Sequence, residues 1–337
     1  MDWDPSRFFR GSGSPSPYAL LVLHQPINER AFEELGEHAS FIICADGGGN
    51  RLYDMMKTRG KESSKVRHPG AAHVRLPDTI LGDLDSLRPA VRQHYEDLGV
   101  SIIKDPDQYS TDFTKCLNYL NDHTAEIIAS PRNPAGQQEN KRPSHSPPDT
   151  PLDVVILGGL GGRVDQAFSQ IHHLYMMTQT QREPREATDA NTKNIQDRIA
   201  SQRPKTGSIG NLYLVSEESI TFVLQKGKNV IHTPGTRRPD IKCSSPKDSR
   251  PEGESPRKRK RDGPEPELFF EQNIGIIPLA GPASITTHGF EWDVQDWHTA
   301  IGGQLSTSNH IRAEQVEVEA SEPVLFTVEL AARLKRR

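Results

Sequence analysis

The sequence is poor in cysteine. Its 337 residues include only Cys44, Cys116 and Cys243, and no two of them form a C-x-x-C pair. A sparse, odd-numbered set argues against a disulfide framework or a zinc site and is typical of a reducing compartment. We therefore expect a cytoplasmic protein.

The sequence also lacks long apolar runs and an excess of charge of one sign. No run approaches the roughly 20 residues that span a bilayer. Met1–Ser16 is polar, without the apolar stretch of a secretory signal. The 41 Lys and Arg residues nearly balance the 45 Asp and Glu residues, and the formal net charge is −4. This balance excludes a general polyanion binder, so we expect neither nucleic acid nor membrane as a partner.

Apolar residues are scarce in three long segments. The chain is 34% hydrophobic and 26% charged, with a mean hydropathy of −0.66. Ser130–Pro151, Gln181–Gly207 and Thr236–Glu267 are polar or proline-rich, and none can bury enough apolar surface to offset its chain entropy. We predict that all three are disordered insertions.

The third of these segments contains a basic run, Arg257–Arg261. Five consecutive basic residues are compatible with a nuclear import signal or a nucleic-acid patch. Glu252, Glu254 and Glu265 lie nearby, which favours a solvated loop.

Strand and helix patterns alternate in the first half of the chain. Such alternation predicts a mainly parallel sheet with helices on both faces, a Rossmann-like α/β domain over residues 17–207. The predicted strands are Tyr18–His24, Phe41–Ala45, Thr79–Leu81, Val100–Ile103 and Asp153–Leu157. The predicted helices are Asn28–His38, Asn50–Lys57, Pro89–Leu98, one capped by Ser110 or Thr111 and reaching about Asn121, and one from Val164 whose apolar face is Val164, Ala167, Phe168, Ile171, Leu174 and Tyr175.

The second half consists of short strand-like runs separated by Gly, Pro and Asn. This pattern predicts an all-β sandwich domain over residues 208–337. The runs are Leu212–Val215, Ile220–Leu224, Asn229–His232, Ile274–Leu279, Ala283–Thr287, Phe290–Val294, Val316–Glu319 and Val324–Leu330.

Acidic residues follow several of the predicted parallel strands. Asp46, Asp83, Asp85 and Asp112 stand in this position, and ligands of an open parallel sheet bind beyond the carboxyl ends of its strands. Converging carboxylates need a cation, and Mg²⁺ is the natural partner of oxygen ligands and phosphates. Alternation in an extended segment would place Asp83 and Asp85 on the same side. Taken alone, such an acid is usually a helix cap or turn residue, and D-x-D is a common sequence.

Two glycine-rich segments join a predicted strand to a predicted helix. Gly47–Gly49 and Gly158–Gly162 let backbone N–H groups approach an anion, and Arg163 can clamp a phosphate. A tight turn is the alternative function of these glycines. Neither segment is a Walker A loop or a G-x-G-x-x-G motif, so neither uses those phosphate cradles.

The motifs together resemble fungal-type thiamine pyrophosphokinase (thiamine diphosphokinase). The order is Ala-Asp-Gly-Gly, Gly-Asp-Leu-Asp-Ser, Asp-Gln-x-x-Thr-Asp-Phe-Thr-Lys and Gly-Gly-x-Gly-Gly-Arg-x-Asp-Gln, followed by Thr-Thr-x-Gly-x-x-Trp and Ser-Thr-Ser-Asn, between about Tyr18 and Leu330. The resemblance implies a transferase that moves the pyrophosphoryl group of Mg·ATP to the hydroxyl of thiamine and releases AMP. It also implies an α/β catalytic domain, a β-sandwich and a homodimer with thiamine bound between subunits.

The resemblance assigns roles to individual residues. It implies that Asp83, Asp85 and Asp112 are the catalytic, Mg²⁺-binding acids, and that Asp112 orients the thiamine hydroxyl or accepts its proton. The implied ATP-binding residues are Asp46, Gly47, Gly48, Gly162, Arg163 and Asp165, and the implied thiamine-binding residues are Gln108, Trp292, Ser308 and Asn309. Tyr109 departs from the family pattern, because many relatives have an acid there. Taken alone, Trp292 is better explained as a core or interface aromatic, and Trp297 is the alternative tryptophan.

Two other functions are compatible with the acids. One is a Mg²⁺-dependent nucleotide phosphohydrolase or sugar-nucleotide transferase that uses Asp83-Leu84-Asp85 and needs no thiamine. The other is a non-catalytic thiamine sensor, although a sensor of a cationic vitamin needs no phosphate-transfer metal site. Thiamine-dependent release of AMP distinguishes the first alternative from the main prediction.

Overall fold

The computed structural model of the protein describes residues 1–11, 14, 16–63, 75–129, 151–180, 209–238 and 267–336. The segments predicted to be disordered insertions lie outside these residues, apart from a few residues at their ends, and so does Arg257–Arg261. Those predictions therefore remain untested. No helix in the described part of the chain is long and apolar enough to cross a membrane.

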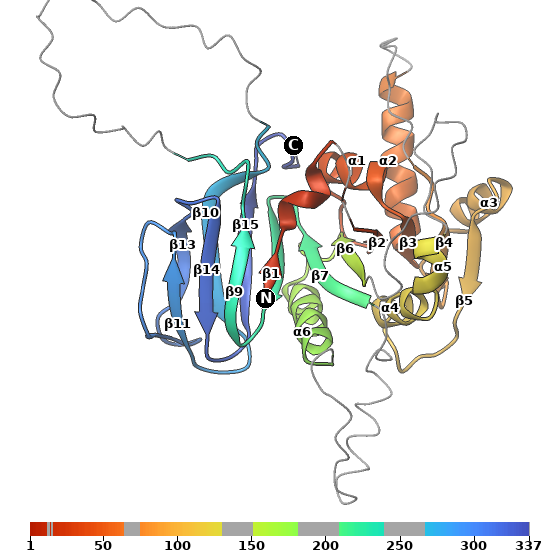
Figure 1. Ribbon diagram of the computed structural model, residues 1–337. Helices are drawn as coiled ribbons and strands as arrows, with labels where there is room; N and C mark the ends of the chain where they lie inside the picture. Colours follow the sequence, from red (N-terminus) through yellow and green to blue (C-terminus); the bar gives the residue numbers. More distant parts are fainter. Residues whose placement is uncertain are drawn as a thin grey trace, which may run out of the picture.

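A ten-stranded sheet runs through the molecule (Figure 1). Six neighbouring strands are parallel, in the order β5-β4-β3-β2-β6-β7. They are β2 (Tyr18–Val22), β3 (Phe41–Ala45), β4 (Thr79–Gly82), β5 (Ser101–Lys104), β6 (Leu152–Leu157) and β7 (Ile209–Val215). The predicted parallel sheet is confirmed.

Helices cover both faces of the parallel strands. One core contains apolar side chains of α1 (Glu29–His38), α2 (Gly48–Ser63) and α3 (Pro89–Asp97), and the opposite core contains those of α4 (Asp112–Asp122), α5 (Thr124–Ala129) and α6 (Val164–Thr180). Two helix starts are fixed by predicted caps. The Asn28 side chain accepts a hydrogen bond from the Ala31 amide, and the Thr111 hydroxyl accepts one from the Thr114 amide.

The remaining four strands continue the same sheet in antiparallel fashion. They are β8 (Ser219–Leu224), β15 (Val324–Leu330), β10 (Phe270–Pro278) and β13 (Ser306–His310). A second, five-stranded sheet packs on them through a shared core; its strands are β1 (Asp2–Trp3), β9 (Gly227–His232), β14 (Gln315–Ala320), β11 (Ala283–His288) and β12 (Trp297–Thr299). The predicted C-terminal β-sandwich is therefore present. Because β7 pairs with β6, the two halves share one sheet, and the division at residues 207 and 208 stays a prediction.

The N-terminal ten residues are part of the fold, although no strand or helix was predicted for them. β1 pairs with β9, and a 3₁₀ helix, η1 (Pro5–Phe9), follows it. Trp3, Phe8 and Phe9 are at most 3% exposed. This segment begins in the second sheet and packs against Tyr18 of the parallel half, so it links the two halves.

Two predicted features are wrong in detail. Phe290–Val294 is a turn rather than a strand, because the Asp293 carboxylate accepts hydrogen bonds from the backbone amides of Gly289 and Phe290. The apolar face of α6 is buried only in part. Leu174 is buried, whereas Val164 and Phe168 are 70% and 64% exposed.

Candidate active site

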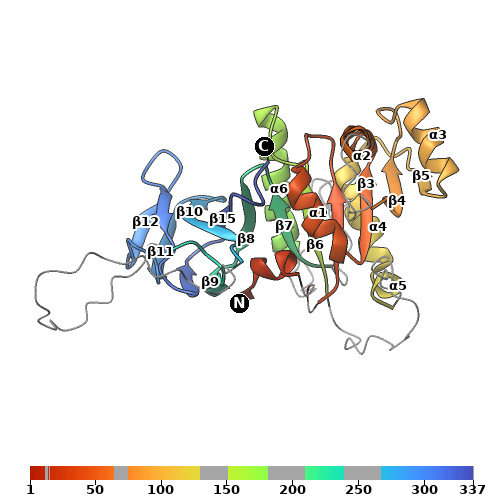
Figure 2. The same ribbon diagram turned by 90° about the horizontal axis from the view of Figure 1, so that it is seen from above.

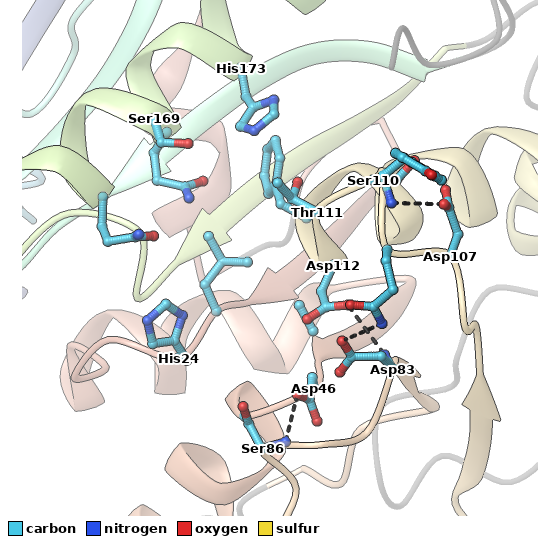
Figure 3. Close-up of a pocket in the computed structure, with 18 residues that line it drawn as sticks. His24, Asp46, Asp83, Ser86, Asp107, Ser110, Thr111, Asp112, Ser169 and His173 are labelled. Atoms are coloured by element: carbon cyan, nitrogen blue, oxygen red, sulfur yellow. Dashed lines mark hydrogen bonds between the residues drawn. The ribbon is translucent and has the colours of Figure 1, made fainter. Parts of the chain in front are cut away.

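A cavity of about 420 Å³ opens at the carboxyl ends of the parallel strands (Figure 3). Its walls come from the ends of β2, β3 and β4, from the loop before α4, and from α6. The lining residues include His24, Asp46, Gly47, Asp83, Ser86, Asp107–Phe113, Gln166, Ser169, Gln170 and His173. This is the edge of the sheet where the sequence predicted the ligand.

Three carboxylates meet in this cavity. One oxygen each of Asp46, Asp83 and Asp112 lies within 4.8 Å of the other two. Asp46 is 3% exposed, and burial raises the pKa of its carboxyl. Its Oδ2 accepts a hydrogen bond from the Ser86 amide, but its Oδ1 is buried without a partner. A buried acceptor without a partner beside two further carboxylates fits the oxygen-ligand set of a divalent cation.

Gly82 permits this convergence. A Cβ atom at this position would lie 2.8 Å from Cβ of Asp46 and 2.9 Å from Oδ1 of Asp112. Both separations are far below van der Waals contact, so any other residue would push the two acids apart. The role of Gly82 was not predicted from the sequence, although the glycine directly precedes Asp83 at the end of β4.

Lys115 is a second residue whose role the sequence analysis missed. It is 4% exposed, and its ammonium group donates hydrogen bonds to Oδ1 of Asp112 and to the carbonyl of Asp105, each at 3.1 Å. The sequence feature that indicates this ion pair is the i, i+3 spacing of Asp112 and Lys115 in one helix. Lys115 balances one of the three carboxylates, and the two remaining negative charges match a divalent cation.

Asp85 does not join the three-carboxylate cluster. Leu84 has φ +64°, in the left-handed region, so the segment is not extended and the alternation that would pair Asp83 with Asp85 is broken. The Asp85 side chain is exposed and accepts a hydrogen bond from the Ser86 hydroxyl. The geometric reason for pairing the two acids was therefore wrong, and the role of Asp85 in a metal site stays a prediction.

Gln108 lies at the acid cluster, and its predicted contact with thiamine stays a prediction. Its side-chain amide donates a hydrogen bond of 3.3 Å to Oδ2 of Asp83 and lines the cavity. The backbone amide of Asp85 and this Gln108 amide lower the pKa of Asp83. Tyr109, the neighbouring departure from the family pattern, is 87% exposed at the cavity rim.

One glycine-rich segment reaches the cavity at Gly47, and the other precedes α6 outside the residues that line it. Gly47 lines the cavity and Gly48 begins α2, where a Cβ atom would lie 2.2 Å from the carbonyl oxygen of Val22. Gly162, with φ +64°, precedes the start of α6. There the Arg163 guanidinium donates two hydrogen bonds to the Asp165 carboxylate, and both side chains are largely exposed. Arg163, which was predicted to bind a phosphate, is thus paired with Asp165 of the same helical turn.

Two histidines of the cavity were also missed. Burial lowers the pKa of His173 to about 4 and also lowers the pKa of His24, so both rings are neutral near pH 7. The His173 ring lies 5.0 Å from the Phe113 ring. The signal for the α6 wall was the polar series Gln166, Ser169, Gln170 and His173, which recurs at helical spacing on one face.

Trp292, Ser308 and Asn309 lie far from the cavity. The lining residues within the described part of the chain all fall between Leu23 and His173. β13, which carries Ser308 and Asn309, is at one edge of the ten-stranded sheet, and six strands separate it from β3. At about 4.8 Å between neighbouring strands, the two sites are roughly 30 Å apart. Figure 2 shows β12 and α3 at opposite ends of the molecule. One chain therefore does not bring the predicted thiamine residues together.

Two family models match the chain. Residues 32–184 match the thiamin pyrophosphokinase catalytic domain, and residues 259–325 match the thiamin pyrophosphokinase vitamin B1 binding domain. Together the two matches span about two thirds of the chain. The first match contains the cavity and the second contains Trp292, Ser308 and Asn309.

Relatives resemble the chain over nearly its whole length. Thiamine pyrophosphokinase 1 of rice is 28% identical over 316 residues, which are 93% of this chain and 87% of the relative. Thiamine pyrophosphokinase of Saccharomyces cerevisiae is 25% identical over 340 residues, covering 92% and 85%. The solved thiamin pyrophosphokinases of Candida albicans and yeast each share the fold with a TM-score of 0.63 at 23% identity, over 98% of this chain and 93% and 91% of theirs.

Proposed function

Because the chain belongs to the thiamine pyrophosphokinase family, we propose that its cavity is where a pyrophosphoryl group passes from ATP to the hydroxyl of thiamine. The observation that carries this assignment is the convergence of Asp46, Asp83 and Asp112 around the unpartnered Oδ1 of Asp46. The comparisons give no support to a phosphohydrolase, a sugar-nucleotide transferase or a thiamine sensor.

The three acids would hold Mg²⁺, with Asp85 as a further predicted ligand. The bound cation would neutralise charge on the phosphates of ATP. Asp112 is anchored through Oδ1 by Lys115 and by the amide of Asp83. Gln108 holds Asp83 from the other side of the cluster. The chain's own hydrogen bonds thus fix the acids before a ligand enters, which lowers the cost of reorganisation during transfer.

The transfer itself is an in-line displacement. The thiamine hydroxyl oxygen bonds to the β-phosphorus of ATP, and the bond from that phosphorus to the oxygen shared with the α-phosphorus breaks. AMP leaves with those electrons. We assign Asp112 to orient the hydroxyl and to accept its proton, because this acid stands at the start of α4 and lines the cavity.

ATP is assigned to the glycine-rich side of the cavity. Gly47 and Gly48 stand at the start of α2, and Gly162, Arg163 and Asp165 stand at the start of α6. Both helix N-termini favour an anion. The Arg163 fork can exchange its Asp165 partner for a phosphate, because both side chains are solvent-accessible.

Thiamine requires a second copy of the chain in this proposal. The aromatic face for the thiazolium is Trp292, which is 55% exposed but roughly 30 Å from the acids of its own chain. A homodimer in which one copy supplies the cavity and its partner supplies the tryptophan completes the site. Val164 and Phe168, exposed on the helix that lines the cavity, offer apolar surface for that contact. The free, buried Cys44 and Cys116 support a cytoplasmic location.

The test is an assay of purified protein with Mg·ATP and thiamine that measures thiamine diphosphate and AMP together. We expect the two products in equal amounts, and loss of both in Asp83→Asn and Asp112→Asn. ADP with thiamine monophosphate would mean transfer at the wrong phosphorus. ATP hydrolysis without a thiamine product would favour the alternative that the protein is a nucleotide phosphohydrolase. Asp85→Asn, tested in parallel, decides whether that exposed acid joins the metal site.

A further inference from the structure

The side chain of Asn309 makes three hydrogen bonds, all of them to backbone groups. Its Oδ1 accepts hydrogen bonds from the amides of Trp292, at 3.1 Å, and His310, at 2.8 Å. Its Nδ2 donates to the carbonyl of Trp292 at 2.8 Å. Asn309 is 7% exposed. It therefore holds both backbone polar groups of Trp292 from a buried position and offers little surface to a ligand.

Burial distinguishes Asn309 from Ser308. Both residues lie in β13, whose pairing with β10 is shifted by a β-bulge between Ser306 and Asn309. Ser308 is exposed, whereas Asn309 is buried. Of the two residues, Ser308 is therefore the one whose side chain is open to a ligand, and the implied Ser-Asn pair of thiamine contacts stays a prediction.

The three hydrogen bonds of the Asn309 side chain, called the Asn309 clamp below, also fix the rings around Trp292. The Trp292 and His310 rings lie 5.1 Å apart, centre to centre, and Asn309 binds the amides of both residues. The His310 ring in turn contacts the Glu291 carboxylate, which also binds Arg312. One side of the indole thus packs on a fixed partner, while more than half of the side chain remains open.

We propose that Asn309 is a positioning residue for thiamine binding, which fixes the backbone and ring of Trp292 and makes no direct contact with the ligand. This inference rests on the proposed role of Trp292 as the aromatic face for thiamine. It predicts that every effect of Asn309 on thiamine passes through Trp292.

The clamp itself is tested without any ligand, by hydrogen–deuterium exchange of the Trp292 amide in the whole protein. We expect Asn309→Ala to expose this amide to exchange by at least about tenfold, because the amide loses its acceptor. Thr307→Ala, an exposed neighbour in the same strand, is the matched control and should leave the exchange rate unchanged. Asn309→Asp keeps an oxygen acceptor and covers the case in which the alanine variant does not fold. Unchanged protection of the Trp292 amide in Asn309→Ala, or loss of its protection in Asn309→Asp, which retains the acceptor, would overturn the clamp.

A double-mutant cycle tests whether Asn309 affects thiamine binding only through Trp292. We expect Asn309→Ala to raise the KM for thiamine by about tenfold while the KM for ATP stays unchanged, and we expect Trp292→Ala with Asn309→Ala to be no worse than Trp292→Ala alone. A double variant that loses the full product of both effects would show direct contact and overturn the proposal. A Trp292→Ala enzyme with normal thiamine KM would instead overturn the thiamine site, even if the exchange result holds.

Discussion

At the level of single residues, the ammonium group of Lys115 supplies a positive charge to the three carboxylates of Asp46, Asp83 and Asp112. It is buried beside Asp112, and it stands where the three carboxylates would otherwise repel one another. A bound divalent cation and Lys115 would therefore both reduce the repulsion among the three carboxylates.

Lys115→Met should make the protein depend on Mg²⁺ for stability. Without the ammonium group we expect the metal-free protein to lose roughly 1–2 kcal/mol of unfolding free energy, because the crowded carboxylates lack a partner. Added Mg²⁺ should then raise the melting temperature more than it does for the unaltered protein. Thermal unfolding with and without MgCl₂ measures this. Lys104→Met, which removes an exposed charge nearby, is the control; an equal Mg²⁺ shift in the Lys115 variant would contradict the prediction.

His173 should weaken the fold in acid. Its pKa is lowered from 6.5 to about 4 by burial, with a smaller contribution from His172, so the unfolded chain takes up this proton before the folded chain does. Stability from this site is complete above pH 6.5 and is lost as the pH falls towards 4, by at most about 3 kcal/mol. His173→Gln should flatten this part of the stability curve in urea unfolding at several pH values. If the variant kept the full slope between pH 4 and 6.5, another group would be responsible; His172→Gln is the comparison.

At the level of elements, the sequence predicted what depends on regular periodicity. The strands β2 to β6 are short apolar runs, and α1 and α4 begin at the predicted caps Asn28 and Thr111. The positions of Asp46, Asp83 and Asp112 followed from strand ends in a parallel sheet. These features are local or follow from one topological rule, so a single sequence contains enough information to predict them.

The sequence could not predict features that depend on single side chains or on distant contacts. Phe290–Val294 has the apolar content of a strand, yet the Asp293 carboxylate folds it into a turn. One left-handed residue, Leu84, removed Asp85 from the cluster. The polar N-terminal segment became ordered through contacts with β9, more than 200 residues away in sequence. Such outcomes follow from tertiary packing rather than from pattern.

The N-terminal segment should contribute to the stability of the whole fold. The Phe8 ring lies 5.0 Å from the ring of Tyr18 and 4.8 Å from that of Tyr213, both in the central sheet. We expect Phe8→Ala to lower the unfolding free energy by about 3 kcal/mol, because it leaves a cavity in the core. Urea unfolding measures the loss. Leu98→Ala, at a residue 48% exposed, should change stability by less than about 0.5 kcal/mol. A loss below about 1 kcal/mol for Phe8→Ala would mean that the segment packs only loosely.

At the level of the whole molecule, the continuous sheet keeps the cavity and Trp292, the two parts of the proposed site, apart. The cavity lies at β3 and β4, and Trp292 lies beyond the opposite edge, next to β13. The intervening strands are hydrogen-bonded to one another in turn, β6 to β7 and β7 to β8, so one continuous sheet holds the two parts apart. A site that uses both parts must therefore join two chains.

Subunit mixing tests this arrangement directly. Asp112→Asn damages the cavity and Trp292→Ala damages the proposed aromatic face, so each variant alone should be inactive or nearly so. In a mixed dimer one site carries both substitutions and the other carries neither. With random pairing of equal amounts, half of the dimers are mixed and about a quarter of the normal activity should return. Asp112→Asn mixed with Asp83→Asn is the control, because both substitutions lie in the cavity and every site then contains one of them. Recovery in neither mixture would mean that each chain builds its site alone, and would also remove the reason for a homodimer.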